Sequence, residues 1–358
     1  MTKTKVAILY GGRSVEHGVS INSARNIYEF LDKEKFEPIP IGIAQSGKWF
    51  LTSTIDKEIE QGKPLRLQLD PGRPSFMTED RTAYFADIVF PVLHGTDGED
   101  GSIQGLLKAL ELPMVGTGVL GSAMSMNKLV AKRILREAGL PVANFMFRSF
   151  GDNAFTFEAV KDNLGLPFMV KSASLGSSVG VSKVKAKSDF SLAVTEAFRY
   201  DDVVLFEEFI EGRELECAVL GNDPPQASLP GEIIISKAYD FYTFDAKYVD
   251  GEAVRIEVPA QLDKMVAENI RDLSVKAYQS LYCEDFARVD LFLTADHKVY
   301  INEINTIPGF TNSSMFPMMW KERGIGFSLL ITKLLELAQE RFSKSKRKER
   351  DYTSKLKF

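Results

Sequence analysis

The feature that most constrains the fold is a pair of segments near the C-terminus in which apolar and polar residues alternate. The segments are residues 287–292 and 299–305, with a short polar stretch at 294–298 between them. Alternation with a period of two is typical of a half-buried β-strand, so the pattern predicts two strands. The stretch between them is the length of a hairpin turn. We therefore expect an antiparallel hairpin with one polar face.

Four polar side chains belong to this expected hairpin. Arg288 and Asp290 share a face of the first strand, and Glu303 and Asn305 share a face of the second. If the two faces coincide, two carboxylates and an amide oxygen, which suit Mg²⁺, meet beside a guanidinium that binds anionic oxygen. A solvated outer face is the competing interpretation. The loop at 306–315, with a Pro-Gly bend and small hydroxyl residues, favours a site for phosphate chemistry.

Length and composition bound the class of protein. The chain has 358 residues, too many for one ordinary core, and its 44% hydrophobic content is enough to bury two or three. The net charge of -5 gives no sign of nucleic-acid binding, and we expect the basic run at 344–350 to be a solvated tail. No apolar run approaches the roughly 20 residues of a membrane-spanning helix, and the N-terminus has no apolar signal core. We expect a cytoplasmic protein with no membrane insertion.

Cysteine and histidine give little sign of metal or redox chemistry. Cys217 and Cys283 lie far apart in apolar surroundings without metal-ligand spacing, so we expect both in the core. The three histidines, His17, His94 and His297, are too scattered for a transition-metal site. Of these we keep only His94 as a candidate, because it begins a glycine-rich loop.

The first third of the chain reads as alternating strands and helices. We expect strands at 5–10, 36–43 and 88–93 and helices at 20–31 and 101–110. Ser20 is the expected N-cap of the first helix. This order of elements favours a parallel sheet flanked by helices.

Two loops follow strands of this expected sheet, at residues 11–17 and 94–101. Ligands gather beyond the carboxyl ends of parallel strands, which makes Glu16 and His94 candidate substrate anchors. A carboxylate such as Glu16 or Glu99 is also favoured simply by a nearby helix N-terminus, and both interpretations stay open. The first loop lacks the G-x-G-x-x-G spacing of a dinucleotide site.

The middle of the chain suggests a phosphate flap. The pattern predicts a helix at 125–138 and strands at 167–171, 179–183 and 203–210. The small residues at 172–178 offer backbone N–H groups to phosphate. Because a strand follows them, we expect a flap between antiparallel strands and not a P-loop. Residues 236–248 have no clean period and are either a loop over a site or an ordinary surface loop.

Six motifs give the chain a resemblance to a known family. They are Gly11–His17, His94-Gly95 with residues 98–101, Lys171 with residues 176–180, residues 242–248, Arg288-Val289-Asp290, and residues 302–309. In this order they resemble the D-alanine:D-alanine ligases of the ATP-grasp superfamily, from the first strand to about Leu337. The resemblance implies ATP-dependent joining of two D-alanine molecules through an acyl phosphate, for peptidoglycan precursors.

The resemblance also implies the architecture: an α/β, three-domain ATP-grasp fold with an N-terminal parallel α/β domain, in a homodimer. The implied domains are residues 1–118 with the first D-alanine site, 119–208 with the flap, 209–344 with the metal site and a mobile loop, and a basic tail at 345–358.

The family's site residues carry over onto matching positions of this sequence. For ATP these are Lys128 and Lys171 on phosphates, Glu207 and Ile210 near adenine, Glu214 on the ribose and Lys247 on the γ-phosphate. For two Mg²⁺ or Mn²⁺ ions they are Asp290, Glu303 and Asn305. For catalysis and substrates they are Glu16 and His94 on the first D-alanine, Ser314 and Met315 on the second, and Arg288 and the Gly309 N–H on the oxyanion.

The resemblance also implies that Glu16, Ser177 and Tyr248 form a hydrogen-bonded set that closes the site. In this set Ser177 would not be a nucleophile. Relatives that make D-alanyl-D-lactate carry a histidine-bearing loop in place of the segment ending at Tyr248, so the resemblance favours the dipeptide. A D-alanine:D-lactate or D-alanine:D-serine ligase is the first alternative. A catalytically silent ATP-grasp binding protein is the second, and the intact Arg288 and Asp290 argue against it.

Overall fold

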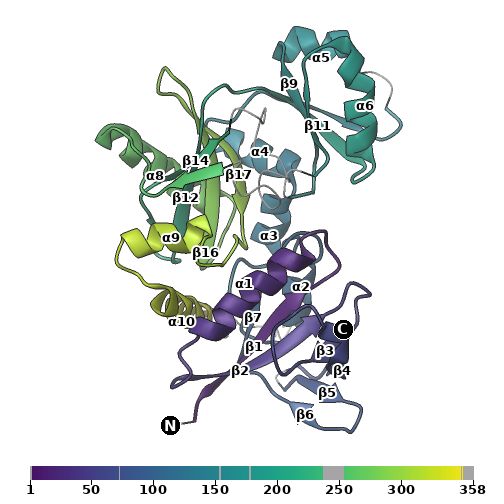
Figure 1. Cartoon of the computed structure of the whole chain (residues 1–358), viewed down its shortest axis with the longest axis vertical. Coiled ribbons are helices and arrows are strands. Elements are labelled where there is room, and N and C mark those ends of the chain that lie inside the picture. The colour runs from purple at the N-terminus through teal and green to yellow at the C-terminus, as the bar shows by residue number, and fades with distance from the viewer. Residues whose placement is uncertain are drawn as a thin grey trace, which may run out of the picture.

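The structure is a computed structural model and describes residues 2–71, 73–152, 155–176, 179–236, 254–347 and 349. Three of the predicted site residues, Ser177, Lys247 and Tyr248, lie outside the described residues, as does nearly all of the segment 236–248. The described residues form three sheets with helices packed on them, which confirms the α/β class (Figure 1).

The first sheet contains the N-terminal part of the chain. Its strands, in spatial order, are β6 (Ala83–Tyr84), β5 (Ser75–Thr78), β4 (Lys63–Gln68), β3 (Trp49–Leu51), β2 (Phe36–Ile43), β1 (Thr4–Gly11) and β7 (Ile88–Pro91). β1 runs parallel to both β2 and β7, as predicted. The antiparallel strands β3 to β6 were not predicted, because they are only two to six residues long. The helices of this part are α1 (His17–Phe30) and α2 (Ser102–Ala109), with a 3-10 turn at Ile59–Gln61.

The prediction that Ser20 caps the first helix is wrong. Helix α1 begins at His17, and Ser20 lies inside it. The Ser20 hydroxyl accepts the N–H of Gly11 at 2.8 Å and donates to the carbonyl oxygen of Val92. The hydroxyl of a serine near the start of a helix either caps the helix or bonds to other nearby backbone groups. Here it bonds to backbone groups at the ends of the parallel strands β1 and β7.

The single helix predicted at 125–138 is two helices. They are α3 (Val119–Met126) and α4 (Lys128–Glu137), and Asn127 stands between them in extended conformation. The Asn127 side chain accepts the N–H of Val130 at 3.0 Å, so it is the N-cap of α4. The cap fixes where α4 begins and therefore where its first residue, Lys128, points.

The second sheet is a small antiparallel unit at the top of Figure 1. Its strands, in order, are β10 (Val181–Val184), β9 (Phe168–Ser172), β11 (Val203–Glu208) and β8 (Phe145–Ser149). Helices α5 (Phe157–Leu164) and α6 (Lys187–Phe198) pack on it. The antiparallel pairing of β9 with β10 confirms the arrangement predicted for the strands on either side of the flap.

The third sheet carries the predicted hairpin. Its strands, in order, are β15 (Val254–Glu257), β14 (Gly231–Ile235), β12 (Arg213–Leu220), β16 (Phe286–Leu293) and β17 (Val299–Asn305), with β13 (Gln226–Ala227) paired to β12. Its helices are α8 (Lys264–Ser280), α9 (Met315–Glu322) and α10 (Phe327–Ser345). Helices α8 and α9 both contact β12, and α10 lies between this sheet and the first one (Figure 1).

The hydrophobic cores divide the molecule unevenly. One cluster joins the first sheet and α1 to the third sheet, α9 and α10. Within it the Phe310 ring lies 6.1 Å from those of Phe90 and Phe286, which belong to the first and third sheets. The second sheet has a core of its own with α5 and α6. The first and third sheets are therefore packed as one body. The second sheet, which has its own core, is attached to that body.

Both cysteines are buried and unpaired, as expected, and burial raises the pKa of Cys217 to about 11 and that of Cys283 to about 12. No helix within the described ranges is both long and apolar enough to cross a membrane.

Candidate active site

The strand register confirms that the four polar groups of the hairpin share one face. Arg288 lies opposite Asn305, and Asp290 lies opposite Glu303, in the antiparallel pairing of β16 with β17. Side chains directly opposite each other in such a pair are within contact distance. The alternation in the sequence therefore placed these groups correctly.

A β-bulge adds a fifth group that alternation alone did not predict. The register shifts after Asp290, so that Leu291 pairs with Ile301 and Asn302 is the extra residue of β17. Asn302 and Glu303 consequently both line the same cavity although they are adjacent in sequence. Asn302 accepts a hydrogen bond from the Lys171 amine at 3.3 Å.

The Arg288 guanidinium organises this face. It donates to both oxygens of Asp290, at 2.7 and 2.8 Å, and forms an ion pair with Glu216 at 2.9 Å. Asn305 donates to Asp290 at 3.0 Å. Sequence reasoning missed Glu216, although the spacing of Glu214 and Glu216 on β12 is the same alternation that revealed the hairpin face.

A cavity of about 390 Å³ lies between the second and third sheets; we call it the larger cavity. All the described residues predicted for ATP line it: Lys128, Lys171, Glu207, Ile210 and Glu214. Asp290 and Glu303 line it as well. Its wall thus combines apolar strand residues with two lysines and several carboxylates, which suits a base at one end and phosphates at the other.

Two buried lysines hold Glu207. Lys171 donates to one Glu207 oxygen at 2.8 Å, and the Lys132 amine lies 3.4 Å from the other. Burial alone would raise the pKa of Glu207, but attraction to the two lysines outweighs it and lowers the pKa. For Lys132 burial outweighs the attraction and lowers the pKa; for Lys171 the carboxylates outweigh burial and raise it. Sequence reasoning missed Lys132, whose position on α4 gives no signal of a site.

A second cavity of about 130 Å³, the smaller cavity, adjoins the first. It brings together four residues predicted from distant parts of the sequence, Glu16, His94, Arg288 and Gly309, and also Asn305 and Glu99. Five residues line both cavities: Lys128, Leu175, Gly176, Glu216 and Glu303. Glu303 therefore stands at the junction of the two spaces.

His94 links the first sheet to the loop after β17. Its Nδ1 lies 2.8 Å from the carbonyl oxygen of Ile307, and its Nε2 lies 3.0 Å from the Ser23 hydroxyl, which also accepts the N–H of Phe310 at 3.1 Å. This pattern fits a neutral ring that donates through Nδ1 and accepts through Nε2. Burial lowers the pKa of His94, against the opposing effect of Glu16.

Glu99 is an acidic group of the smaller cavity with an altered charge state. Its two oxygens accept the N–H groups of Gly95 and Ile307, at 2.8 and 3.0 Å. Burial, reinforced by repulsion from Glu16, raises the pKa of Glu99 to about 8. The raised pKa favours the protonated form of Glu99, and a cationic group placed between Glu99 and Glu16 would favour the ionised form.

The structure does not place Ser314 and Met315 on the lining of either cavity. Ser314 precedes α9, and a Cβ added to Gly309 would lie 3.1 Å from its hydroxyl, so it adjoins the smaller cavity. The Met315 side chain is buried in the core, which leaves only its backbone N–H, in the first turn of α9, to meet a ligand.

The donor set of the hairpin fits a hard divalent cation. Asp290, Glu303 and Asn305 offer carboxylate and amide oxygens, which Mg²⁺ and Mn²⁺ prefer. Arg288 and Asn305 occupy three acceptor positions of the Asp290 carboxylate, and about four such positions exist on a carboxylate. Among the described residues there is no cluster of three or more His, Cys, Asp or Glu side chains placed to hold a metal. Beyond Asp290 and Glu303, a cation here would therefore need Asn305 and ligands that a substrate brings to complete its coordination.

Comparison with family models matches nearly the whole chain. A model described as D-ala D-ala ligase N-terminus matches residues 5–117, and one described as D-ala D-ala ligase C-terminus matches residues 134–336. D-alanine--D-alanine ligase A of Salmonella typhimurium is 45% identical over 355 residues, covering 95% of this chain and 97% of the relative. That of Escherichia coli is 44% identical over 355 residues, with the same coverage.

Solved structures are similar over the same extent. The D-alanine-D-alanine ligase from Coxiella burnetii has a TM-score of 0.85 and 38% identity, and the match covers 97% of each chain. The VanG D-Ala:D-Ser ligase from Enterococcus faecalis also has a TM-score of 0.85, with 34% identity over 94% of this chain and 100% of the other. The fold is therefore shared by ligases whose names give different second substrates.

Proposed function

The chain belongs to the D-alanine:D-alanine ligase family, and from this premise we propose how its residues divide the work of joining two D-alanine molecules with ATP. The family has the ATP-grasp fold, and the chain is an enzyme of this class. The carboxylate of one D-alanine takes the γ-phosphoryl group of ATP, which gives D-alanyl phosphate and ADP. The amine of the second D-alanine then displaces phosphate and gives D-alanyl-D-alanine, a unit of peptidoglycan precursors.

The observation that carries the proposal is the pair of adjoining cavities with Glu303 and Lys128 on both. ATP in the larger cavity would have its phosphates at Lys128 and Lys171, next to the smaller cavity. A carboxylate in the smaller cavity would then lie close to the γ-phosphoryl group. Placing two reactants in such proximity is a main source of rate enhancement in phosphoryl transfer.

Adenine would occupy the apolar end of the larger cavity, near Ile210 and Glu207, with the ribose at Glu214. Lys132 would act at a distance by holding Glu207, and Glu207 in turn orients Lys171. Lys247 is proposed for the γ-phosphate from the resemblance alone.

Asp290, Glu303 and Asn305 would hold the divalent cations, either Mg²⁺ or Mn²⁺. When bound, such cations supply charge stabilisation for the transferring phosphoryl group. Arg288 is held by Asp290 and Glu216, and from there it would bind the oxyanion of the tetrahedral intermediate together with the Gly309 N–H.

The first D-alanine would bind in the smaller cavity. Its ammonium group would lie at Glu16 and Glu99, and the neutral His94 ring would form part of the wall. The carboxylate of the second would meet Ser314 and the Met315 N–H, at the first turn of α9. The hydrogen-bonded set that includes Ser177 and Tyr248 remains a proposal. In its support, a Cβ on Gly176, the residue before Ser177, would lie 3.2 Å from Glu16.

The remaining features are also proposals that the family resemblance supports. They are a homodimer, a cytoplasmic location, and domain boundaries near residues 118 and 208.

The test is phosphate release by the purified protein with ATP and Mg²⁺, with products identified by mass spectrometry. Release with D-alanine alone, giving D-alanyl-D-alanine, would support the proposal, and chelation of the divalent cation should abolish it. Release only when D-lactate or D-serine is added would move the protein to the alternative ligases. No release with any acceptor would favour a silent binding protein.

A further inference from the structure

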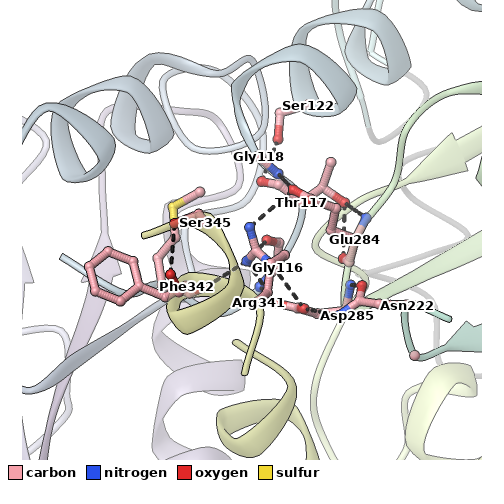
Figure 2. A network of polar contacts seen from close by, with 12 residues as sticks. Gly116, Thr117, Gly118, Ser122, Asn222, Glu284, Asp285, Arg341, Phe342 and Ser345 are labelled. Carbon is pink, nitrogen blue, oxygen red and sulfur yellow. Dashed lines mark hydrogen bonds and ion pairs between the residues drawn. The ribbon is translucent and has the colours of Figure 1, made fainter. Parts of the chain in front are cut away.

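Arg341, on the C-terminal helix α10, reaches into a junction where residues 114–118, Asn222 and residues 284–285 meet (Figure 2). Its guanidinium donates to the carbonyl oxygens of Met114 and Gly116, both at 2.8 Å. It also donates to both Asp285 oxygens, at 3.2 and 2.8 Å, and to Glu284 at 3.0 Å. One side chain thus binds two separate segments, 114–116 and 284–285, from a third.

Asp285 is the centre of this junction. It is fully buried, and besides Arg341 its carboxylate accepts the N–H of Gly116 at 2.9 Å and the amide of Asn222 at 2.9 Å. Its backbone N–H donates to Asn222 at 2.7 Å. A buried carboxylate with this many donors is satisfied only when every segment is in place.

The segments also approach too closely to slide past one another. The Thr117 hydroxyl accepts the N–H of Glu284 at 3.1 Å, and Glu284 accepts the N–H of Gly118 at 3.1 Å. A Cβ on Gly118 would lie 2.8 Å from the Glu284 carboxylate, and one on Gly121 would collide with the carbonyl of Tyr282. The contacts in Figure 2 therefore define one relative position of the segments.

The position of the junction in the chain connects it to the smaller cavity. Residues 114–118 lead out of the first sheet, whose loops carry Glu16 and His94. Asp285 immediately precedes β16, and Arg288 follows it by three residues. The smaller cavity is lined both by the first-sheet loops and by β16. Within the described part of the chain, by contrast, no residue before Lys128 lines the larger cavity.

We propose that Arg341 is a positioning residue that sets the spacing of Glu16 and His94 against Arg288, an inference that rests on the proposed function. Its planar guanidinium binds two carbonyls and two carboxylates at once. A lysine in its place supplies the charge but not this geometry. The shared hydrophobic core packs the two parts into one body, and the directional hydrogen bonds of Arg341 additionally set the distance between residues 114–116 and 284–285.

The test compares R341M and R341K with a matched control, R271M, in the purified full chain. Arg271 is also an ion-paired helix arginine, bound to Glu268 and to the Ala227 carbonyl, but it lines neither cavity. For R341M we expect the KM for D-alanine to rise about tenfold, and for R341K less, with the ATP Kd from calorimetry within about twofold of wild type. R271M should change neither quantity.

Two results would overturn the proposal. One is a folded R341M whose KM for D-alanine stays within about twofold of wild type. The other is an equal loss of ATP and D-alanine binding, which a purely structural role predicts. If R341M does not fold, T117V removes one link of the junction and should give the same split with a smaller rise, and an unchanged KM there would equally contradict us. Failure of the proposed function is distinguishable, because the wild-type protein would then have no ligase activity.

Discussion

The two cavities differ in which sheets form their walls and in whether those sheets share a hydrophobic core. The smaller cavity lies between the first and third sheets, which share a hydrophobic core and the Arg341 junction. The larger cavity lies between the second and third sheets, and the second sheet has a separate core. Packed cores do not deform continuously, whereas units with separate cores move relative to each other at lower cost. Apart from Leu175 and Gly176 of the flap, the amino-acid site is therefore built into a rigid body, and the nucleotide site is the place where the molecule adjusts.

Glu303 lines both cavities, so changing it should have the largest effect. We expect E303Q to lower kcat about a hundredfold to a thousandfold, because the loss of one carboxylate removes charge from the transfer site without changing its shape. Phosphate release measures this. E336Q, at an exposed glutamate of α10 that lines neither cavity, is the control. Wild-type turnover in E303Q would contradict the metal assignment.

Lys132 should affect the larger cavity alone. K132M leaves Glu207 with one cation instead of two, so we expect the ATP Kd to rise about tenfold while the KM for D-alanine stays unchanged. Calorimetry with ATP and steady-state kinetics measure the two quantities. K187M removes an exposed lysine that pairs with Glu158 on the second-sheet unit, and it should have no effect. A change in the KM for D-alanine with no change in the ATP Kd would contradict the assignment of Lys132 to the nucleotide site.

Glu99 should give the smaller cavity a pH signature. Its pKa is about 8 in the folded chain and near 4.5 ordinarily, so between these values the folded protein holds a proton that the unfolded chain has released. The contribution of Glu99 to stability therefore falls as pH rises through this window and is constant above it. E99Q lacks this dependence, so its melting temperature relative to wild type should increase with pH. Parallel curves for the two proteins would contradict the assignment.

Asn127 should have the smallest effect. N127A removes the N-cap of α4, and we expect a loss of about 1 kcal/mol in the free energy of unfolding. Denaturant unfolding measures it, and N127D, which keeps a capping oxygen, is the control. A loss in N127D as large as in N127A would show that the cap is not the cause.

Local patterns predicted local structure well. The alternation of charges at Arg288, Asp290, Glu303 and Asn305 predicted the hairpin and its shared face, and β2 has the predicted bounds. The role of Ser20 was wrong, because the sequence does not reveal which of several nearby backbone groups a hydroxyl meets.

Features that depend on contacts between distant segments could not be predicted. Lys132 is an ordinary helix lysine until the fold buries it beside Glu207. The high pKa of Glu99 needs both burial and the approach of Glu16. The shared core follows from the packing of α10 against the first sheet, which no period in the sequence encodes.

The bulge at Asn302 has a consequence for changes in chain length. A regular strand presents every second side chain to a given face, whereas the extra residue of the bulge lets Asn302 and Glu303 face the same space. Removing Asn302 would therefore leave Asp290 opposite Glu303 and Leu291 opposite Ile301, and would cost the cavity only the Asn302 side chain. A one-residue deletion in a regular part of the strand would instead turn the side chains on one side of it to the opposite face.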